Sequence, residues 1–121
     1  MSPRVRTASA STGLKASVLR SAAPVFAALG DETRLRLIAV LCAGSAMSIA
    51  QLTAGTAITR QSVTQHLQVL ANAGLVRDVK VGRERLWAFE PAHVDEARRA
   101  LDAISQQWDQ ALSRLKAMVE E

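Results

Sequence analysis

The chain has 121 residues, of which 49% are hydrophobic and 3% aromatic, with one cysteine and a formal net charge of +4 at pH 7. This length suits one domain with a modest core. No stretch approaches ~18 uninterrupted apolar residues, which excludes a spanning helix, and a lone cysteine excludes an intrachain disulfide and fits a reducing cytoplasm. Residues 1–20 carry four basic and no acidic side chains, so a polyanionic partner is compatible with the charge, which is weak evidence by itself.

The N-terminal residues 1–13 are small, polar and basic, and we expect them to form a flexible tail. A transit peptide is the alternative for such a segment, because it contains arginine and serine and lacks acids. Residues 14–121 are expected to form the folded domain. Its first helix is predicted from Leu14 to Leu29, delayed or bent at Pro24 and stopped by Gly30.

A second helix is predicted in the segment DETRLRLIAVLCA, with Asp31 as its N-terminal cap. The apolar residues Leu35, Ile38 and Leu41 or Cys42 recur at helical spacing and are predicted to face inward. On this interpretation Cys42 is a small buried hydrophobic residue rather than a redox sensor.

The next two helices are short and close together in the sequence. Ser48 and Gln51 have the spacing of a capping box and open the segment SIAQLTAG. Gly55 permits a tight turn, and Thr59 is placed to cap a second helix that ends at Gly74. A short helix, a turn and a further helix predict a helix-turn-helix motif.

The second of these helices has an unusual polar face. Val63, Leu67 and Leu70 form its buried stripe, and neutral amides and hydroxyls occupy the opposite side. Base edges in the major groove of DNA present donors and acceptors rather than net charge, so this composition suits base reading. A solvated helix face is the alternative. The candidate DNA contacts of this helix are Arg60, Gln61, Ser62, Thr64, Gln65, His66 and Gln68, of which His66 lies nearest the buried stripe.

A small β-hairpin is predicted after this helix, because the segments LVRDVKV and RLWAFE are short and β-prone. Lys80, Arg83 and Arg85 surround the turn at Gly82 and could reach DNA phosphates. A charged tip that only keeps the hairpin soluble is the alternative. Trp87 is predicted to pack in the core, as is Phe89.

The chain closes with a long helix, predicted from Ala92 to Val119 after Pro91. Its apolar residues alternate spacings of three and four, a pattern that usually requires a partner helix. That partner is either the first helix of the same domain or a second copy of the chain. The predicted dimerisation residues are Val94, Ala97, Leu101, Ile104, Trp108, Ala111, Leu115 and Met118. The predicted fold class is therefore mainly α with a small β-hairpin, about five helices and a two-stranded wing.

The order of these elements resembles the ArsR-type winged helix-turn-helix repressors. ALGDETRLRLIAVL is similar to the opening signature of that family, SVTQHLQVLANAGLV to its recognition helix, and VGRERLWAF to its wing. The resemblance implies a homodimeric cytoplasmic repressor, commonly autoregulatory, that binds a near-palindromic operator, with the first and last helices pairing across a two-fold axis. It places Gln61, Ser62, Thr64, Gln65 and His66 on DNA, and Arg83 and Arg85 in the wing.

The metal sensors of that family carry a Cys-Val-Cys motif on the helix before the recognition helix. Ser48 and Ala50 stand at those places and supply no thiolate, and Cys42, His66 and His93 are scattered over separate elements. His93 and Asp95 start the last helix, where other relatives place a metal site, but no further histidine follows; His93 is expected to be a surface residue. The chain therefore resembles the metal-independent branch, in which a long last helix often carries a tryptophan, as Trp108 does here, and no cofactor is expected.

Two other functions remain open from the sequence. One is a winged-helix module that binds protein, which would lack the salt-dependent binding to duplex DNA that a repressor must show. The other is a metal-responsive repressor with a non-standard site. An enzyme is not expected, because the sequence has no phosphate-binding loop, nucleophile–base pair or metal-ligand cluster. The inducer cannot be named from the sequence.

Overall fold

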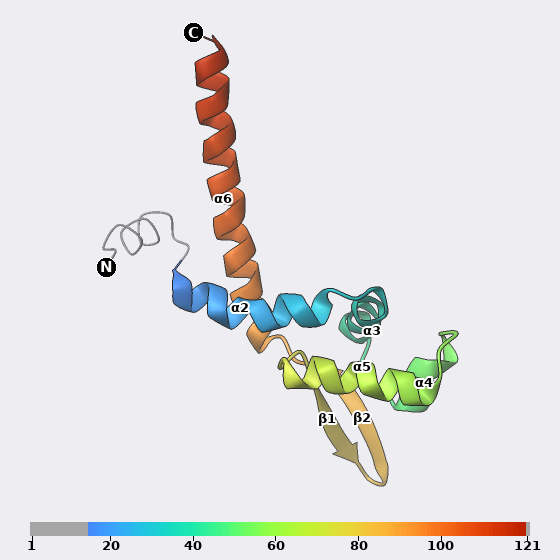
Figure 1. The fold of residues 1–121 in the computed structure, drawn as a ribbon. Helices are drawn as coiled ribbons and strands as arrows, with labels where there is room; N and C mark the ends of the chain where they lie inside the picture. The colour runs from blue at the N-terminus through green and yellow to red at the C-terminus, as the bar shows by residue number, and fades with distance from the viewer. Residues whose placement is uncertain (1–14, 121) are drawn as a thin grey trace. The chain divides into compact units, whose positions relative to one another are not determined.

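The computed structural model describes residues 15–120, so the predicted N-terminal tail and Leu14 lie outside the described residues. Within them are five helices and one two-stranded antiparallel sheet, in agreement with the predicted fold class (Figure 1). The elements in chain order are α2 (Ala16–Leu29), α3 (Glu32–Ala43), α4 (Ile49–Ala54), α5 (Arg60–Asn72), β1 (Val76–Val81), β2 (Glu84–Phe89) and α6 (Ala92–Glu120). None of the described helices is long and apolar enough to cross a bilayer.

The described chain forms two compact units. The central unit, Pro24–Val94, holds α3, α4, α5 and the hairpin, whereas the terminal unit holds the start of α2 up to Ala23 and α6 from Asp95. Helix α2 crosses from one unit to the other, and Pro24 does not delay it, because the helix already begins at Ala16.

Side-chain caps fix where the helices of the central unit begin. Asp31 accepts a hydrogen bond from the backbone N–H of Arg34 at the start of α3. The predicted capping box is present in α4: Ser48 Oγ accepts from Gln51 N–H at 3.1 Å, and Gln51 Oε1 accepts from Ser48 N–H at 2.9 Å. Thr59 Oγ1 accepts from the N–H of Ser62 at 3.1 Å. Each cap satisfies N–H groups that the first helical turn leaves without a partner.

The end of α5 requires a glycine. The N–H of Leu75 bonds to the carbonyl of Leu70, and that of Gly74 to the carbonyl of Ala71, which is the Schellman pattern. Gly74 has φ +78°, and an added Cβ would lie 2.3 Å from Cδ2 of His93. The backbone conformation and the histidine ring thus both exclude a side chain at this position.

The core of the central unit lies between α3, α4, α5 and the base of the hairpin. Helix α5 contacts α3, α4 and β1, and α3 contacts β2. The predicted stripe of α5 is confirmed. The buried apolar residues of the central core, each at most 4% exposed, include Leu37, Leu52, Val63, Leu67, Leu70, Leu75, Val76 and Trp87. Full burial of one such side chain contributes about 1.5–3 kcal/mol relative to leaving it in water.

The prediction of which residues of α3 face inward is partly wrong. Leu37 and Leu41 are buried, whereas Leu35 is 49% exposed and Ile38 is half-buried. Cys42, expected in the core, is exposed. Apolar residues occur all around this helix, so its sequence offers two inward faces, and the contacts with α5 and β2 select the one containing Leu37.

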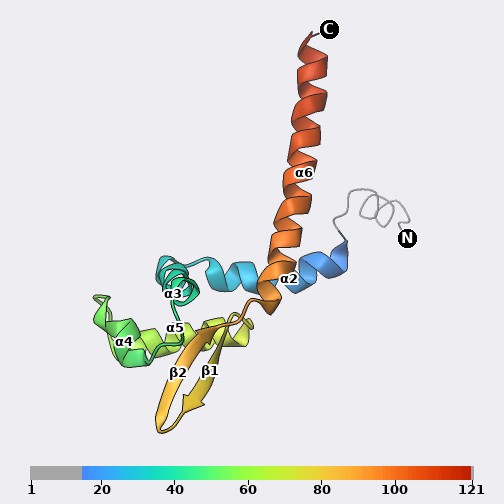
Figure 2. The ribbon, with the colours of Figure 1, turned by 180° about the vertical axis from the view of Figure 1, so that it is seen from behind.

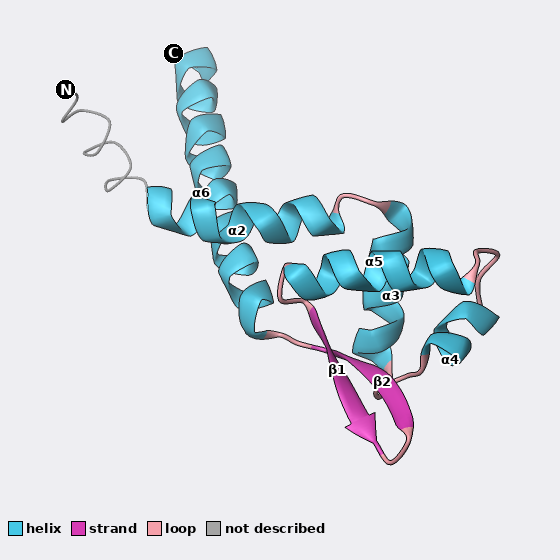
Figure 3. Ribbon diagram, turned by 60° about the horizontal axis from the view of Figure 1, so that its bottom comes forward, coloured by secondary structure: helices cyan, strands magenta, loops and turns pink. Residues whose placement is uncertain are grey.

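The hairpin has the predicted position and a two-residue turn at Gly82, whose φ is +63°. Its register pairs Val76 with Phe89 at the base and Val81 with Glu84 at the tip. A further bridge joins the hairpin to the approach of α4, because Met47 and Trp87 exchange backbone hydrogen bonds of 2.9 and 2.7 Å. Figure 3 shows the two strands projecting from the helices of the central unit and joined by a turn at their far end.

The terminal unit is dominated by α6, which continues without a break to Glu120 (Figure 2). Near its start Ala97 and Ala100 are buried, at 5% and 0% exposure. Further along, large apolar side chains are exposed to solvent in the single chain. These exposed residues are Leu101, Ile104, Trp108, Leu112, Leu115, Met118 and Val119.

Candidate nucleic-acid interface

The outward face of α5 carries the predicted row of neutral polar groups. Gln61, Thr64, Gln65 and Gln68 are exposed, as is Arg60 at the first position, whereas Ser62 is half-buried. Because Val63 and Leu67 are fully buried, this row must face away from the core. The amides and hydroxyls therefore lie where a base edge could approach them.

The members of this row differ in how they are held. Thr64 Oγ1 donates to the carbonyl of Arg60 at 2.8 Å, and Gln68 Nε2 donates to Asn72 Oδ1 at 3.2 Å. The side chains of Gln61 and Gln65, in the first two turns, make no hydrogen bond within residues 15–120. Their amides keep their full donor and acceptor capacity for a ligand.

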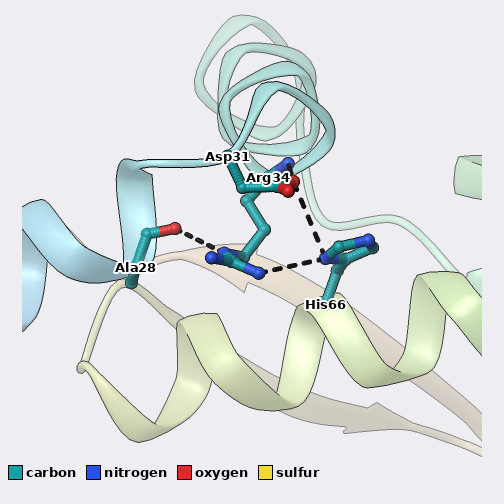
Figure 4. A network of polar contacts seen from close by, with 4 residues as sticks. All are labelled: Ala28, Asp31, Arg34 and His66. Atoms are coloured by element: carbon teal, nitrogen blue, oxygen red, sulfur yellow. Dashed lines mark hydrogen bonds and ion pairs between the residues drawn. The ribbon is translucent and has the colours of Figure 1, made fainter.

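His66 does not belong to this row. Its ring is turned toward the start of α3, where Nδ1 lies 3.3 Å from Arg34 Nη1 and 3.9 Å from Asp31 Oδ2 (Figure 4). Its side chain is only 21% exposed. The helical wheel places His66 near the buried stripe, and the family resemblance places it on DNA. These contacts with Arg34 and Asp31 agree with the helical wheel and do not favour a base contact.

Arg34 links three elements at this point, a role that the sequence pattern did not reveal. Its Nε donates to the carbonyl of Ala28 near the end of α2, and its Nη1 reaches His66 on α5 (Figure 4). The backbone N–H of Arg34 bonds to Asp31 Oδ2 at 3.0 Å, and this bond, with the nearby guanidinium and His66, holds the pKa of Asp31 below its ordinary value. The network attaches α5 to the helices behind it through polar contacts as well as apolar ones.

The basic side chains of the wing differ in whether they are paired. Register and alternation put Asp78, Lys80 and Arg85 on the same face of the hairpin as buried Trp87. Arg85 Nε bonds to Asp78 Oδ2 at 2.9 Å, and the guanidinium carbon lies 5.3 Å from the centroid of the Trp87 ring. Lys80 and Arg83 are exposed and form no ion pair within the described residues. Of the three predicted wing cations, Lys80 and Arg83 are thus unpaired, whereas Arg85 contacts both Asp78 and Trp87.

This chain is similar to known transcriptional regulators. The helix-turn-helix domain family matches residues 29–79. HTH-type transcriptional regulator Rv2034 of Mycobacterium tuberculosis is 30% identical, over 86% of this chain and 94% of its own. The structure of an ArsR-like transcriptional regulator from Rhodococcus sp. RHA1 aligns with a TM-score of 0.71 and 35% identity, over 84% of this chain and 95% of that chain. This chain belongs to the ArsR family of winged helix-turn-helix transcriptional regulators.

A third relative bears on assembly. The solution structure of the homodimeric winged helix-turn-helix DNA-binding domain of Mb0332 from Mycobacterium bovis aligns with a TM-score of 0.58 and 26% identity. The match covers 82% of this chain and 88% of that fragment. The ArsR family is one of transcriptional regulators rather than enzymes.

In this ArsR-family chain, Ser48 and Ala50 stand where the metal sensors carry thiolates. The Ser48 hydroxyl accepts the capping hydrogen bond of α4, and Ala50 has no ligand atom. Cys42 is exposed near the end of α3, and His93 packs against Gly74. Among residues 15–120 there is no group of three or more His, Cys, Asp or Glu side chains that could hold a metal ion.

The predicted dimerisation residues lie along one side of α6. Leu101, Ile104 and Trp108 are 53%, 45% and 65% exposed, whereas Val94 is half-buried and Ala97 is buried near the start of the helix. Leu112 and Val119, which the heptad pattern did not include, widen the exposed apolar stripe. The remaining predicted residues, Ala111, Leu115 and Met118, are exposed as well.

Proposed function

We propose that this ArsR-family chain is a homodimeric repressor that reads a near-palindromic operator through α5 and contacts phosphates through its wing. One observation carries the proposal: the row of exposed, neutral hydrogen-bonding side chains on the outward face of α5, directly after the Thr59 cap. A solvated helix face needs charge or polarity of any kind, whereas base reading needs donors and acceptors.

The two parts of the surface would do different work. The first turns of a recognition helix reach deepest into the major groove, which favours Gln61 and Gln65 as base contacts. Lys80 and Arg83 carry unpaired charge at the hairpin tip, where a cation meets phosphate and contributes affinity without sequence selectivity. Such a role on DNA would place the protein in the cytoplasm.

Self-association is supported by the exposed apolar stripe of α6 and by the homodimeric relative Mb0332. A stripe of this length at a period near 3.5 fits a helix from a second copy. A two-fold dimer would present two copies of α5 to half-sites roughly 34–36 Å apart, one helical turn of DNA. The operator would then share the two-fold symmetry of the protein.

Selection of bound sequences from a random duplex pool, with the purified full chain, tests this function. We expect enrichment of an inverted repeat and an affinity that falls steeply as salt is raised. A dimer that enriches no sequence and binds duplex DNA without salt dependence would instead favour a protein-interaction module. Repression, as opposed to activation, is tested by transcription in vitro from a promoter that overlaps the selected site.

We also propose that regulation does not depend on metal, because the thiolate positions hold Ser48 and Ala50. Zinc, cadmium and arsenite are expected to leave operator affinity unchanged, and Cys42→Ser should leave it unchanged as well. A tight stoichiometric metal site whose occupation releases the operator would contradict this proposal. Equilibrium titrations of operator with each metal, before and after chelation, provide the measurement.

A further inference from the structure

An apolar groove of about 610 Å³ lies in the central unit between α3, α4 and the turn that leads to α5. Its floor includes Leu37 and Leu52, which belong to the core and are 2% and 4% exposed. Val40, on its wall, is 45% exposed, and Ile58 in the turn is half-buried. The groove is therefore a hollow between the two helices, bounded by core side chains and by the more exposed Val40.

The size and lining of this groove suit a small organic molecule. Ligand pockets typically span about 300–1,000 Å³, are mostly apolar and contain a few polar groups that fix orientation. Gly55, at the end of α4, borders the groove, and a Cβ added to it would meet no atom within 4 Å. The described chain thus leaves open space beside the turn of the helix-turn-helix.

The polar groups at the groove identify the ligand chemistry. Arg36 is the one charged side chain among the lining residues that the structure describes, and Thr33 lies one helical turn before it on the same face of α3. Arg36 pairs with Glu32 at 2.5 Å, but these side chains are 74% and 78% exposed. An ion pair so exposed contributes little, so the guanidinium can exchange Glu32 for another carboxylate at small cost.

We propose that this groove binds an apolar monocarboxylic acid, with the hydrocarbon or ring system over Leu37 and Leu52 and the carboxylate on Arg36. The regulatory part of this inference rests on the proposed function. The walls of the groove are the support helix α3 and the first helix of the helix-turn-helix, so a ligand wedged between them moves α4 and the cap that starts α5. Occupation of the groove then lowers operator affinity, and operator lowers ligand affinity by the same factor.

The first experiment uses the purified full chain without DNA and three probes that share one ring system: 2-naphthoate, 2-naphthamide and 2-naphthylmethylammonium. Calorimetry gives the affinities, and amide chemical shifts locate the site. We expect naphthoate to bind about tenfold more tightly than the neutral amide and the ammonium probe to bind most weakly, because only the carboxylate pairs with guanidinium. The shifts should centre on Thr33, Val40, Leu52 and Thr56.

Arg36→Gln tests the assigned cation. This variant should lose about tenfold in naphthoate affinity and none in naphthamide affinity, so that the two probes become equal. Arg98→Gln is the matched control, because Arg98 lies 3.7 Å from Asp95 in a similarly exposed pair on α6, outside the groove. It should bind both probes as the wild type does.

Three outcomes would overturn the inference. The first is that naphthoate does not bind at about 1 mM, a weak-binding limit. The second is that the wild type binds naphthoate and naphthamide with equal affinity. The third is that the chemical-shift changes centre on the α6 stripe around Trp108 instead of the groove. Since ligand binding is measured without DNA and the operator selection is done without ligand, failure of the groove and failure of the proposed DNA function are distinguishable. Release of a selected operator by naphthoate, absent in Arg36→Gln, then tests the regulatory link.

Discussion

Gln61 and Gln65 are the side chains of α5 on which sequence reading should depend most. Both are exposed, both lie in the first two turns, and neither is engaged elsewhere in the described chain. Replacement of either by alanine should cost ~1–3 kcal/mol at the operator and change binding to unrelated duplex little.

Fluorescence titration with both duplexes measures the difference, and Gln106→Ala, at an exposed position of α6, is the matched control. Equal weakening on both duplexes would assign these glutamines to the DNA backbone instead.

The wing cations should differ from one another, because Arg85 is held by Asp78 and Trp87 while Lys80 and Arg83 are not paired. Lys80→Ala and Arg83→Ala should weaken operator and unrelated DNA alike and reduce the log–log salt slope by about one per lost phosphate contact. The sequence pattern predicted the same for Arg85, but the observed pair leads us to expect a smaller effect of Arg85→Ala.

Asp78→Asn provides the reverse test. It removes the carboxylate that holds Arg85, so binding to all duplexes should strengthen and the salt slope should rise. Unchanged binding in Asp78→Asn, with a full loss in Arg85→Ala, would mean that Arg85 already reaches DNA from its paired position. Affinities at several salt concentrations decide between these outcomes.

Asp31 should make stability depend on pH in the acid range. The Arg34 N–H bond and neighbouring positive charge lower its pKa in the folded state. A carboxyl group whose pKa is lowered by folding stabilises the native state at pH values above its unfolded-state pKa. This stabilisation is lost as the pH falls through the folded-state pKa. Asp31→Asn keeps a capping side chain but cannot titrate.

The Tm of the wild type should therefore exceed that of Asp31→Asn at neutral pH, and the difference should fade below pH ~3.9, the ordinary value for aspartate. Thermal unfolding of the two proteins over a pH series gives this comparison. A difference that stays constant down to the most acidic folded condition would show that the charge of Asp31 is not the cause.

At the scale of the elements, the sequence was most informative where local chemistry decides the structure. The capping box of Ser48 and Gln51 and the Thr59 cap need only short-range contacts, and the structure has them where they were predicted. The stripe of α5 was also predictable, because its apolar and polar sides are sharply separated.

Contacts between elements were the part that periodicity could not supply. Helix α3 is apolar on several sides, so only its neighbours show that Leu37 is inside and that Cys42 is exposed. The contacts of the His66 ring with Arg34 and Asp31 likewise join two elements, and periodicity did not predict them. The Asp78–Arg85 pair depends on the hairpin register, which the sequence did not determine.

For the whole molecule, the exposed stripe of α6 predicts how assembly can be separated from folding. Trp108 is 65% exposed in the single chain, so Trp108→Glu removes little packing there but puts charge on the proposed interface. We expect this variant to stay folded and become monomeric, with a loss of operator affinity. Ser113→Glu, exposed on another side of the helix, should remain dimeric.

Sedimentation at micromolar concentration and circular dichroism together provide the test. A wild-type protein that is monomeric under these conditions would rule out the proposed dimer, and an unfolded Trp108→Glu variant would show that Trp108 packs within its own chain.

The backbone bridge between Met47 and Trp87 has a consequence for the shape of the DNA that this protein would accept. It fastens the wing to the residue just before the Ser48 cap, so the hairpin and the paired helices of the central unit cannot turn separately. The distance between the bases that α5 would meet and the phosphates that the wing would meet is then set by the protein. DNA would have to match that spacing, so sequences that adopt it at low deformation energy would be preferred even at base pairs that no side chain touches.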